Sequence, residues 1–205
     1  MQSVLRFGIA GTALVVAAVA AGAQESNNRV AAHTDWSVFE EPPSCRVAAA
    51  SIDACPQDQR VPRQCWIVSG PKEVVNKKGD RIVAVDRGEI RLFVSYQPSL
   101  NVNGQVSFKS GYPFNEGAVV KLKISETVFD LIARGVDDPG TAGLDESQLA
   151  WSKSDDDDAR IIAGMKRGSD AVLTGLSKRN TTTIDTFSLF GFTAAVEDAE
   201  KRCGT

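Results

Sequence analysis

Four cysteines and one histidine carry the most versatile side-chain chemistry in this 205-residue chain. Cys45, Cys55 and Cys65 follow one another at intervals of ten residues, and Cys203 lies near the C-terminus. Structural zinc sites need close ligand pairs such as C-x₂-C, and the sole histidine, His33, belongs to a polar, unpatterned N-terminal segment. The spacing therefore disfavours zinc, and an even cysteine count indicates two disulfides if the chain is exported.

Nucleophilic catalysis lacks its usual groups in this sequence. With the cysteines oxidised and His33 in a flexible segment, neither a Ser-His nor a Cys-His pair has a placed base. The chain contains no G-x-S-x-G or H-E-x-x-H motif. A carboxylate pair for glycoside hydrolysis would leave no local signature, so a carboxylate-based hydrolase stays the alternative. We expect a protein that is not an enzyme, with no catalytic residue and no cofactor.

Two acidic stretches could be mistaken for cation sites. Residues 155–158 are four consecutive aspartates, whereas calcium loops space their carboxylates around a glycine turn so that the oxygens converge. The run is better explained as the first turn of a helix, where carboxylates face the positive end of the helix dipole. The segment 133–150 carries further acids around two glycines, but its spacing matches no EF-hand. We expect no metal at either place.

Charge and aromatic residues mark one candidate partner-binding surface. Residues 60–91 contain eight basic side chains against four acids, whereas residues 126–158 contain ten acids against two basic side chains. Such asymmetry can steer a partner, although it is more often only a solvated surface. Tyr112 and Phe114 flank a proline in a predicted turn, where they could anchor a partner or fold back onto the core. The candidate binding residues are Lys77, Lys78, Tyr112 and Phe114.

The N-terminus has the pattern of a cleavable signal peptide over residues 1–23. Arg6 precedes an uncharged run rich in Ala, Val and Leu, which ends in the small-x-small sequence Ala21-Gly22-Ala23. The alternative is an uncleaved membrane anchor, but the run is shorter and less apolar than the roughly 20 residues that a span needs. Cleavage after Ala23 would leave a periplasmic or secreted chain with no transmembrane span. The net charge of −3 in the whole chain also argues against nucleic acid as a partner.

Short β-branched and aromatic runs between turn residues predict a mainly β fold. The expected strands cover 34–39, 65–69, 81–86, 89–96, 104–109, 118–124, 127–132, 170–177 and 182–190, with a turn at 76–79. Two short helices are expected. Ser154 is the predicted N-cap of the first, and the second runs from about Phe192 to Arg202 and points Cys203 toward the core. We therefore expect a single-domain β-sandwich or partly open barrel over 34–205, preceded by a flexible segment at 24–33.

Several segments of the chain resemble the invasion-associated locus B family. The resemblance is carried by the run from Cys65 to Asn76, by Gly111-Tyr112-Pro113-Phe114, and by segments within 157–168, 181–189 and 191–203, together with Asp35-Trp36-Ser37-Val38-Phe39. It implies an envelope-exported protein, periplasmic in a Gram-negative cell, from a family named for a role in host-cell invasion. No catalytic signature accompanies the resemblance. Residues 40–64 are an insertion relative to shorter relatives.

The insertion favours one of the three possible disulfide pairings. Because it supplies Cys45 and Cys55 together, they most simply pair with each other as a staple of the 40–64 loop. Cys65 and Cys203 would then tie an early strand to the last helix. The expected function is an envelope or binding module without catalytic activity, which acts on an unknown envelope or host protein.

Overall fold

The computed structural model of the protein describes residues 28–133 and 146–204. The predicted signal peptide over 1–23 lies outside these residues, as does most of the acidic 133–150 segment. In the described part of the chain, neither helix is long and apolar enough to cross a membrane.

Among the described residues, twelve strands form one antiparallel sheet, and two further strands pair separately. The order across the large sheet is β1-β2-β5-β8-β9-β12-β11-β10-β13-β14-β6-β7. Alternation of apolar and polar residues sets which side chains face inward, as in β10, where Val120, Leu122 and Ile124 are buried and the lysines between them are exposed. The strands are β1 (Arg29–His33), β2 (Trp36–Glu41), β3 (Ser44–Cys45), β4 (Arg60–Val61), β5 (Gln64–Ser69), β6 (Glu73–Lys78), β7 (Arg81–Ile82), β8 (Arg91–Gln97), β9 (Val102–Lys109), β10 (Val119–Ile124), β11 (Thr127–Ala133), β12 (Leu149–Trp151), β13 (Asp170–Leu176) and β14 (Thr182–Ser188).

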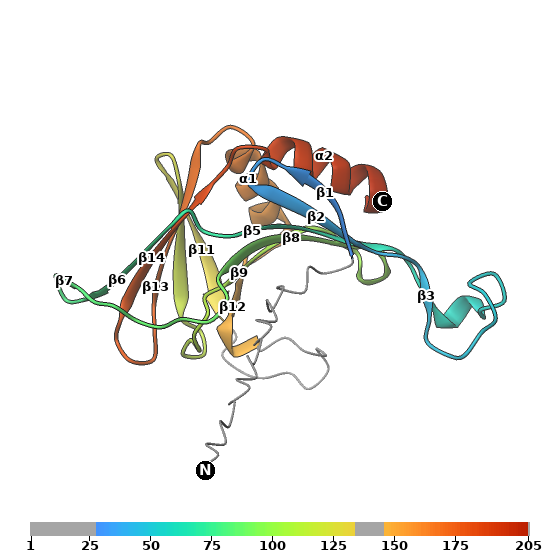
Figure 1. The fold of residues 1–205 in the computed structure, drawn as a ribbon, viewed down its shortest axis with the longest axis horizontal. Helices are drawn as coiled ribbons and strands as arrows, with labels where there is room; N and C mark the ends of the chain where they lie inside the picture. Colours follow the sequence, from blue (N-terminus) through green and yellow to red (C-terminus); the bar gives the residue numbers. More distant parts are fainter. Residues whose placement is uncertain (1–27, 134–145, 205) are drawn as a thin grey trace, which may run out of the picture.

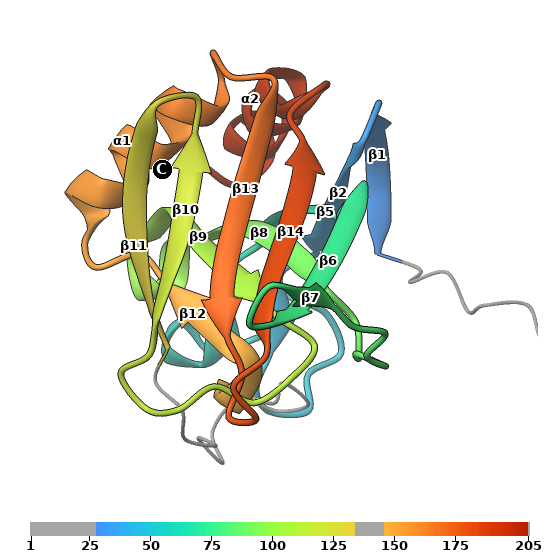
Figure 2. The ribbon, with the colours of Figure 1, turned by 90° about the vertical axis from the view of Figure 1, so that its left-hand side faces the viewer.

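The large sheet curls so that its two halves face each other across one hydrophobic core (Figures 1 and 2). The rings of Phe108 on β9 and Phe187 on β14 meet edge to face at 6.2 Å, although several strands separate them in the sheet order. Trp36 on β2 likewise donates its indole N–H to the carbonyl of Ser188 on β14, at 3.0 Å. Strands β1 and β7 remain as edges, so the sheet does not close into a barrel.

Two α-helices cover one end of the curled sheet, and both were expected (Figure 1). Helix α1 (Asp155–Met165) begins where the Ser154 hydroxyl accepts a hydrogen bond from the Asp157 N–H, as an N-cap does. Helix α2 (Phe192–Cys203) buries Phe192, Val196, Ala199 and Cys203 on one face. Short 3₁₀ turns occur at Gln57–Gln59, Pro98–Leu100 and Glu146–Gln148. The predicted mainly β fold with two helices, one of them C-terminal, is confirmed.

Some local predictions were wrong. Residues 29–33 are not a flexible segment but the edge strand β1, which pairs with β2 from His33–Trp36 onward. The predicted turn at 76–79 is mostly strand, because β6 continues to Lys78 and the chain reverses at Gly79 and Asp80. Of the predicted strand 81–86 only Arg81 and Ile82 are strand, because the last backbone hydrogen bond to β6 is the one from the Val83 N–H to the Asn76 carbonyl. The three-residue strand β12 was not predicted.

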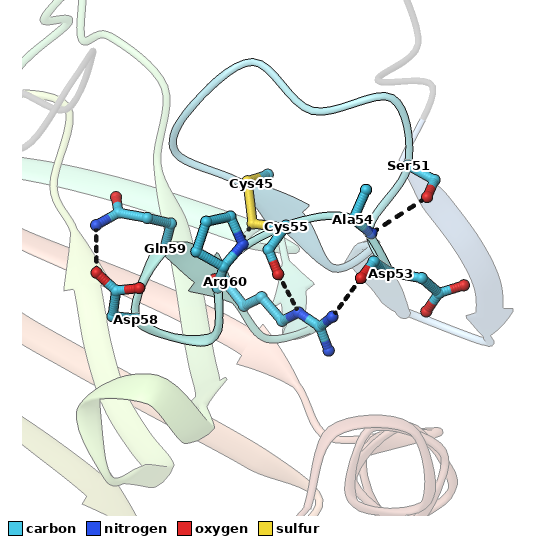
Figure 3. The surroundings of a disulfide bond; sticks show 9 residues. Cys45, Ser51, Asp53, Ala54, Cys55, Asp58, Gln59 and Arg60 are labelled. Atoms are coloured by element: carbon cyan, nitrogen blue, oxygen red, sulfur yellow. Dashed lines mark hydrogen bonds between the residues drawn. A yellow bond between two sulfur atoms is a disulfide. The ribbon is translucent and has the colours of Figure 1, made fainter.

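Residues 42–63 form an arm that projects from the body of the protein beyond β2 and β5 (Figure 1). Within it the sulfur atoms of Cys45 and Cys55 lie at disulfide distance, 2.02 Å (Figure 3). The Arg60 guanidinium donates to the carbonyls of Cys55 and Asp53, which fixes the loop against strand β4. Most side chains of the arm are exposed, so the disulfide and these hydrogen bonds take the place of a core.

The second cysteine pair joins the two ends of the fold. Cys65 on β5 and Cys203 at the end of α2 have their sulfur atoms 2.05 Å apart and are both buried. Helix α2 packs on β1, β2, β5 and β8, so this link holds the C-terminus against one half of the sheet.

Candidate binding surface

The β6–β7 hairpin is the second projection of the molecule, on the side opposite the disulfide-linked arm (Figure 1). Its strands pair Lys77 with Ile82 and Lys78 with Arg81. Strand β14 pairs with β6 only as far as Lys77, so the tip of the hairpin extends past its neighbour. The turn needs a left-handed residue, which Gly79 supplies at φ +58°.

The cations of the hairpin tip form no ion pair with described residues, although the turn between Lys78 and Arg81 contains an acid, Asp80. Lys78 and Arg81 are exposed and stand directly opposite each other, so their side chains share one face of the hairpin. Neither side chain, nor that of Lys77, forms an ion pair within the described residues. Like charges in directly opposed positions destabilise a sheet, so the pairing does not serve the stability of the hairpin.

Exposed apolar residues lie on the same segment of the chain as these charges. Ile82 is 75% exposed, more than any other large hydrophobic residue that the structure describes. Val74 on β6 and Val85, which follows β7, are also exposed. Ile82 shares its face of the hairpin with Lys77, whereas Lys78 and Arg81 lie on the other face, so the tip presents an apolar contact on one side and paired cations on the other.

The structure places the four predicted binding residues in two different environments. Lys77 and Lys78 lie on the hairpin, where Lys77 is half-buried and Lys78 exposed. Phe114 is fully buried in the core and packs edge to face on Tyr112, with the ring centres 5.0 Å apart. Tyr112 is partly buried, and its hydroxyl is 2.8 Å from the Thr183 hydroxyl. Of the two alternatives given for these rings, the structure shows the second, in which the turn folds back onto the core.

A buried ion pair that the sequence analysis missed fixes the base of the hairpin. The Arg87 guanidinium donates from Nη1 and Nη2 to the two carboxylate oxygens of Asp185, each at 2.7 Å, and the two side chains are 4% and 0% exposed. Arg87 also donates to the carbonyl of Ser110 and to the side-chain oxygen of Asn76 on β6. Its guanidinium carbon lies 5.0 Å from the centre of the Tyr112 ring. The segment after β7 is thus tied to β6, β14 and the loop after β9.

The electrostatics of this pair reflect its burial. Removal from water raises the pKa of Asp185, and the hydrogen bonds and charge of Arg87 oppose that rise. Desolvation likewise raises the pKa of Tyr112 to about 12. Next to the ion pair, two backbone segments pack closely at two glycines. The Gly88 N–H donates to the Gly111 carbonyl, and a Cβ on Gly111 would lie 2.5 Å from the Gly88 oxygen. A charged residue inside an otherwise apolar and threonine-rich strand was the signal that could have identified Asp185.

His33 is placed by the structure, contrary to expectation. Its Nε2 lies 3.1 Å from a carboxylate oxygen of Asp198 on α2, so it connects the edge strand β1 to the last helix. Burial would raise the pKa of Asp198, but hydrogen bonds from His33 and Arg202 lower it below the usual value. The His33–Asp198 pair therefore has a structural role in holding β1.

Ser69 and Lys72 have the sequence spacing of a catalytic Ser-Lys pair, but their side chains contact other residues. Residues Ser69-Gly70-Pro71-Lys72 form an S-x-x-K sequence, a motif that we had expected to be absent from the chain. The Ser69 hydroxyl donates to the carbonyl of Asp35, and the Lys72 ammonium pairs with Asp170. The two side chains are thus each engaged elsewhere. Within the described chain, no three or more His, Cys, Asp or Glu side chains gather as a metal site would need.

Comparison with known proteins yields a similarity of fold. The chain matches no protein-family model and no curated protein. Among solved structures, it is similar to the crystal structure of invasion associated protein B from Bartonella henselae, with 14% sequence identity and a TM-score of 0.45. The match covers 83% of this chain and 95% of that one. This similarity concerns the fold alone.

Proposed function

We propose that the protein is an extracytoplasmic, non-enzymatic binding module of the invasion-associated locus B type, which recognises an acidic surface on a partner protein through its β6–β7 hairpin. The observation that carries the proposal is the opposed pair Lys78 and Arg81, exposed at the tip with no ion pair of their own. A partner carboxylate placed between the two cations would remove their repulsion. Relief of the repulsion between Lys78 and Arg81 would then contribute to the binding free energy.

Ile82 supplies the apolar part of the proposed contact. It is 75% exposed and stands opposite Lys77 on the ladder, so these two side chains share the face of the hairpin opposite to that of Lys78 and Arg81. A partner that wraps around the tip would contact both faces. Long-range charge would govern the rate of encounter, and burial of Ile82 would slow dissociation. The ion pair of Arg87 with Asp185 would serve this function by holding the hairpin in one orientation.

Export to the periplasm belongs to the same proposal. The N-terminal pattern predicts cleavage after Ala23, and two cysteine pairs at disulfide distance suit an oxidising compartment. The sequence resemblance described above suggests a partner in the envelope or on a host cell, and a contribution to envelope function or to host-cell invasion.

Site-specific photo-crosslinking in producing cells tests the proposed surface. A benzophenone amino acid replaces Ile82 in one strain and Phe190 in another, since Phe190 is also strongly exposed, at 64%, but lies between β14 and α2. We expect an adduct with an acidic protein from position 82 and none from position 190. The proposal would be wrong if position 82 gave no adduct, or if both positions captured the same proteins.

A further inference from the structure

Helix α1 lies beside the β10–β11 hairpin, at the end of the sheet that carries the helices (Figure 2). Residues of the second half of α1 and of this hairpin line a cleft. Its volume is about 440 Å³, within the range of small-molecule sites, which is roughly 300–1,000 Å³. Ile124, Phe129, Ala163 and Gly164 give it an apolar floor. No aspartate or glutamate belongs to its lining, so it lacks the carboxylate pair of a glycoside hydrolase.

Two arginines from α1 and its C-terminal end line the same cleft. The guanidinium carbon of Arg160 lies 5.5 Å from the centre of the Phe129 ring, so the cation is held over the floor. Arg160 also contacts Asp157 at 3.2 Å, but with 68% of its side chain exposed this pair contributes little. The side chain of Arg167 forms no ion pair or hydrogen bond with any described residue. The cleft therefore offers two cations above an apolar surface.

Gly164 provides an independent indication of a ligand. It lies inside α1, where glycine destabilises a helix relative to alanine. Packing does not require the glycine, because a Cβ there would meet Ile124 and Phe129 at 3.5–4.0 Å, which is ordinary contact. The methyl group would instead fill part of the cleft. Helix α1 thus contains a destabilising glycine at the position where any side chain would fill part of the cleft.

We propose that this cleft binds a small amphipathic anion, with its apolar body on Ile124 and Phe129 and its acid group between Arg160 and Arg167. Arginine presents paired N–H donors to carboxylate and phosphate groups, and both arginines can reach the mouth of the cleft from one helix face. The negative end of the α1 dipole opposes an anion here, so both guanidiniums are needed. The site is separate from the β6–β7 hairpin and does not depend on the function proposed for it.

Titration calorimetry of the mature chain tests the site with four probes: 2-naphthoate, 2-naphthyl phosphate, 2-naphthol and inorganic phosphate. We expect the two naphthyl anions to bind at one site, and 2-naphthol and inorganic phosphate to bind at least about tenfold more weakly, since each lacks half of the recognition. A preference for one naphthyl anion would identify the acid group as carboxylate or phosphate. Equal binding of 2-naphthol, or no binding of either naphthyl anion, would overturn the proposal.

Three variants link the binding to these residues. Arg167→Gln should weaken the naphthyl anions about tenfold, whereas Lys166→Gln, an equal loss of charge on the adjacent residue outside the lining, should leave them unchanged. Gly164→Ala should weaken binding while raising Tm by roughly 2–4 °C, a combination that misfolding cannot produce. Unchanged affinity in both Arg167→Gln and Gly164→Ala would contradict the assignment of the cleft.

Discussion

Replacement of Arg87 by methionine would leave the Asp185 carboxylate buried without its counter-charge. The two side chains are 4% and 0% exposed, and both contacts between them are 2.7 Å. Loss of one partner from a buried pair destabilises by about 3–5 kcal/mol. In a domain of this size about 1 kcal/mol corresponds to 2–4 °C, so we expect Tm to fall by roughly 6–20 °C. Urea unfolding of the mature chain measures the free energy directly.

Two further measurements separate a stranded charge from simple loss of packing. Arg87→Met combined with Asp185→Leu should recover most of the lost stability, because it removes the unpaired carboxylate as well. In Arg87→Met alone, Asp185 loses the group that opposes the rise in its pKa. A raised pKa in the folded state contributes stability that is lost as pH rises, so the deficit against wild type should be smaller at about pH 5 than at pH 7.

Arg179→Met, at an exposed position, is the control and should change the unfolding free energy by less than about 0.5 kcal/mol. The reasoning would be refuted if Arg87→Met were as stable as this control, or if the double variant were no more stable than Arg87→Met.

Three other predictions concern the parts that hold the fold. Cys203→Ser should destabilise the fold by up to about 5 kcal/mol and Cys55→Ser by up to about 3 kcal/mol, because the Cys65–Cys203 disulfide closes a much longer loop than Cys45–Cys55. Urea titration measures both losses, and equal losses would contradict this prediction. Phe114→Ala should lower the unfolding free energy by about 3–5 kcal/mol, as for a fully buried ring, and a Tm within a degree of wild type would instead mean an exposed side chain. Asp198→Asn should make the unfolding free energy fall less steeply as the pH is lowered below about 4. The depressed pKa of Asp198 contributes stability that is lost as pH falls below the unfolded value of about 4, so an equally steep fall in wild type and variant, measured by urea titration, would argue against the His33–Asp198 contact.

Local sequence patterns predicted most of the secondary structure. The alternation in 119–124 gave β10, and Ser154 with the acidic run after it marked the start of α1. Strand β1 was missed because its short, alanine-rich sequence has weak strand propensity, and pairing with β2 and the contact of His33 with Asp198 decide its conformation. Strand β12 is only three residues long and exists because β9 and β11 flank it.

The candidate site was less accessible to sequence reasoning. The basic character of 60–91 was visible, but the opposition of Lys78 and Arg81 depends on the register of a hairpin, and residues 76–78 of its first strand were expected to be a turn. Arg87 and Asp185 are 98 residues apart, and a single sequence does not reveal a contact at that distance. The fate of Tyr112 and Phe114 depended on whether the loop after β9 folds onto the core, which only tertiary structure decides.

The association rate of the partner captured at Ile82 tests the central claim most directly, when measured at low salt for the wild type and two charge reversals. Lys78→Glu places an acid opposite Arg81, which should stabilise the hairpin by about 0.2–1 kcal/mol and yet slow association by roughly tenfold. Arg46→Glu makes the same charge change on the disulfide-linked arm, at the other end of the molecule, and should leave the rate within about twofold of wild type (Figure 1). Equal rates for folded Lys78→Glu and Arg46→Glu would contradict recognition through the β6–β7 hairpin.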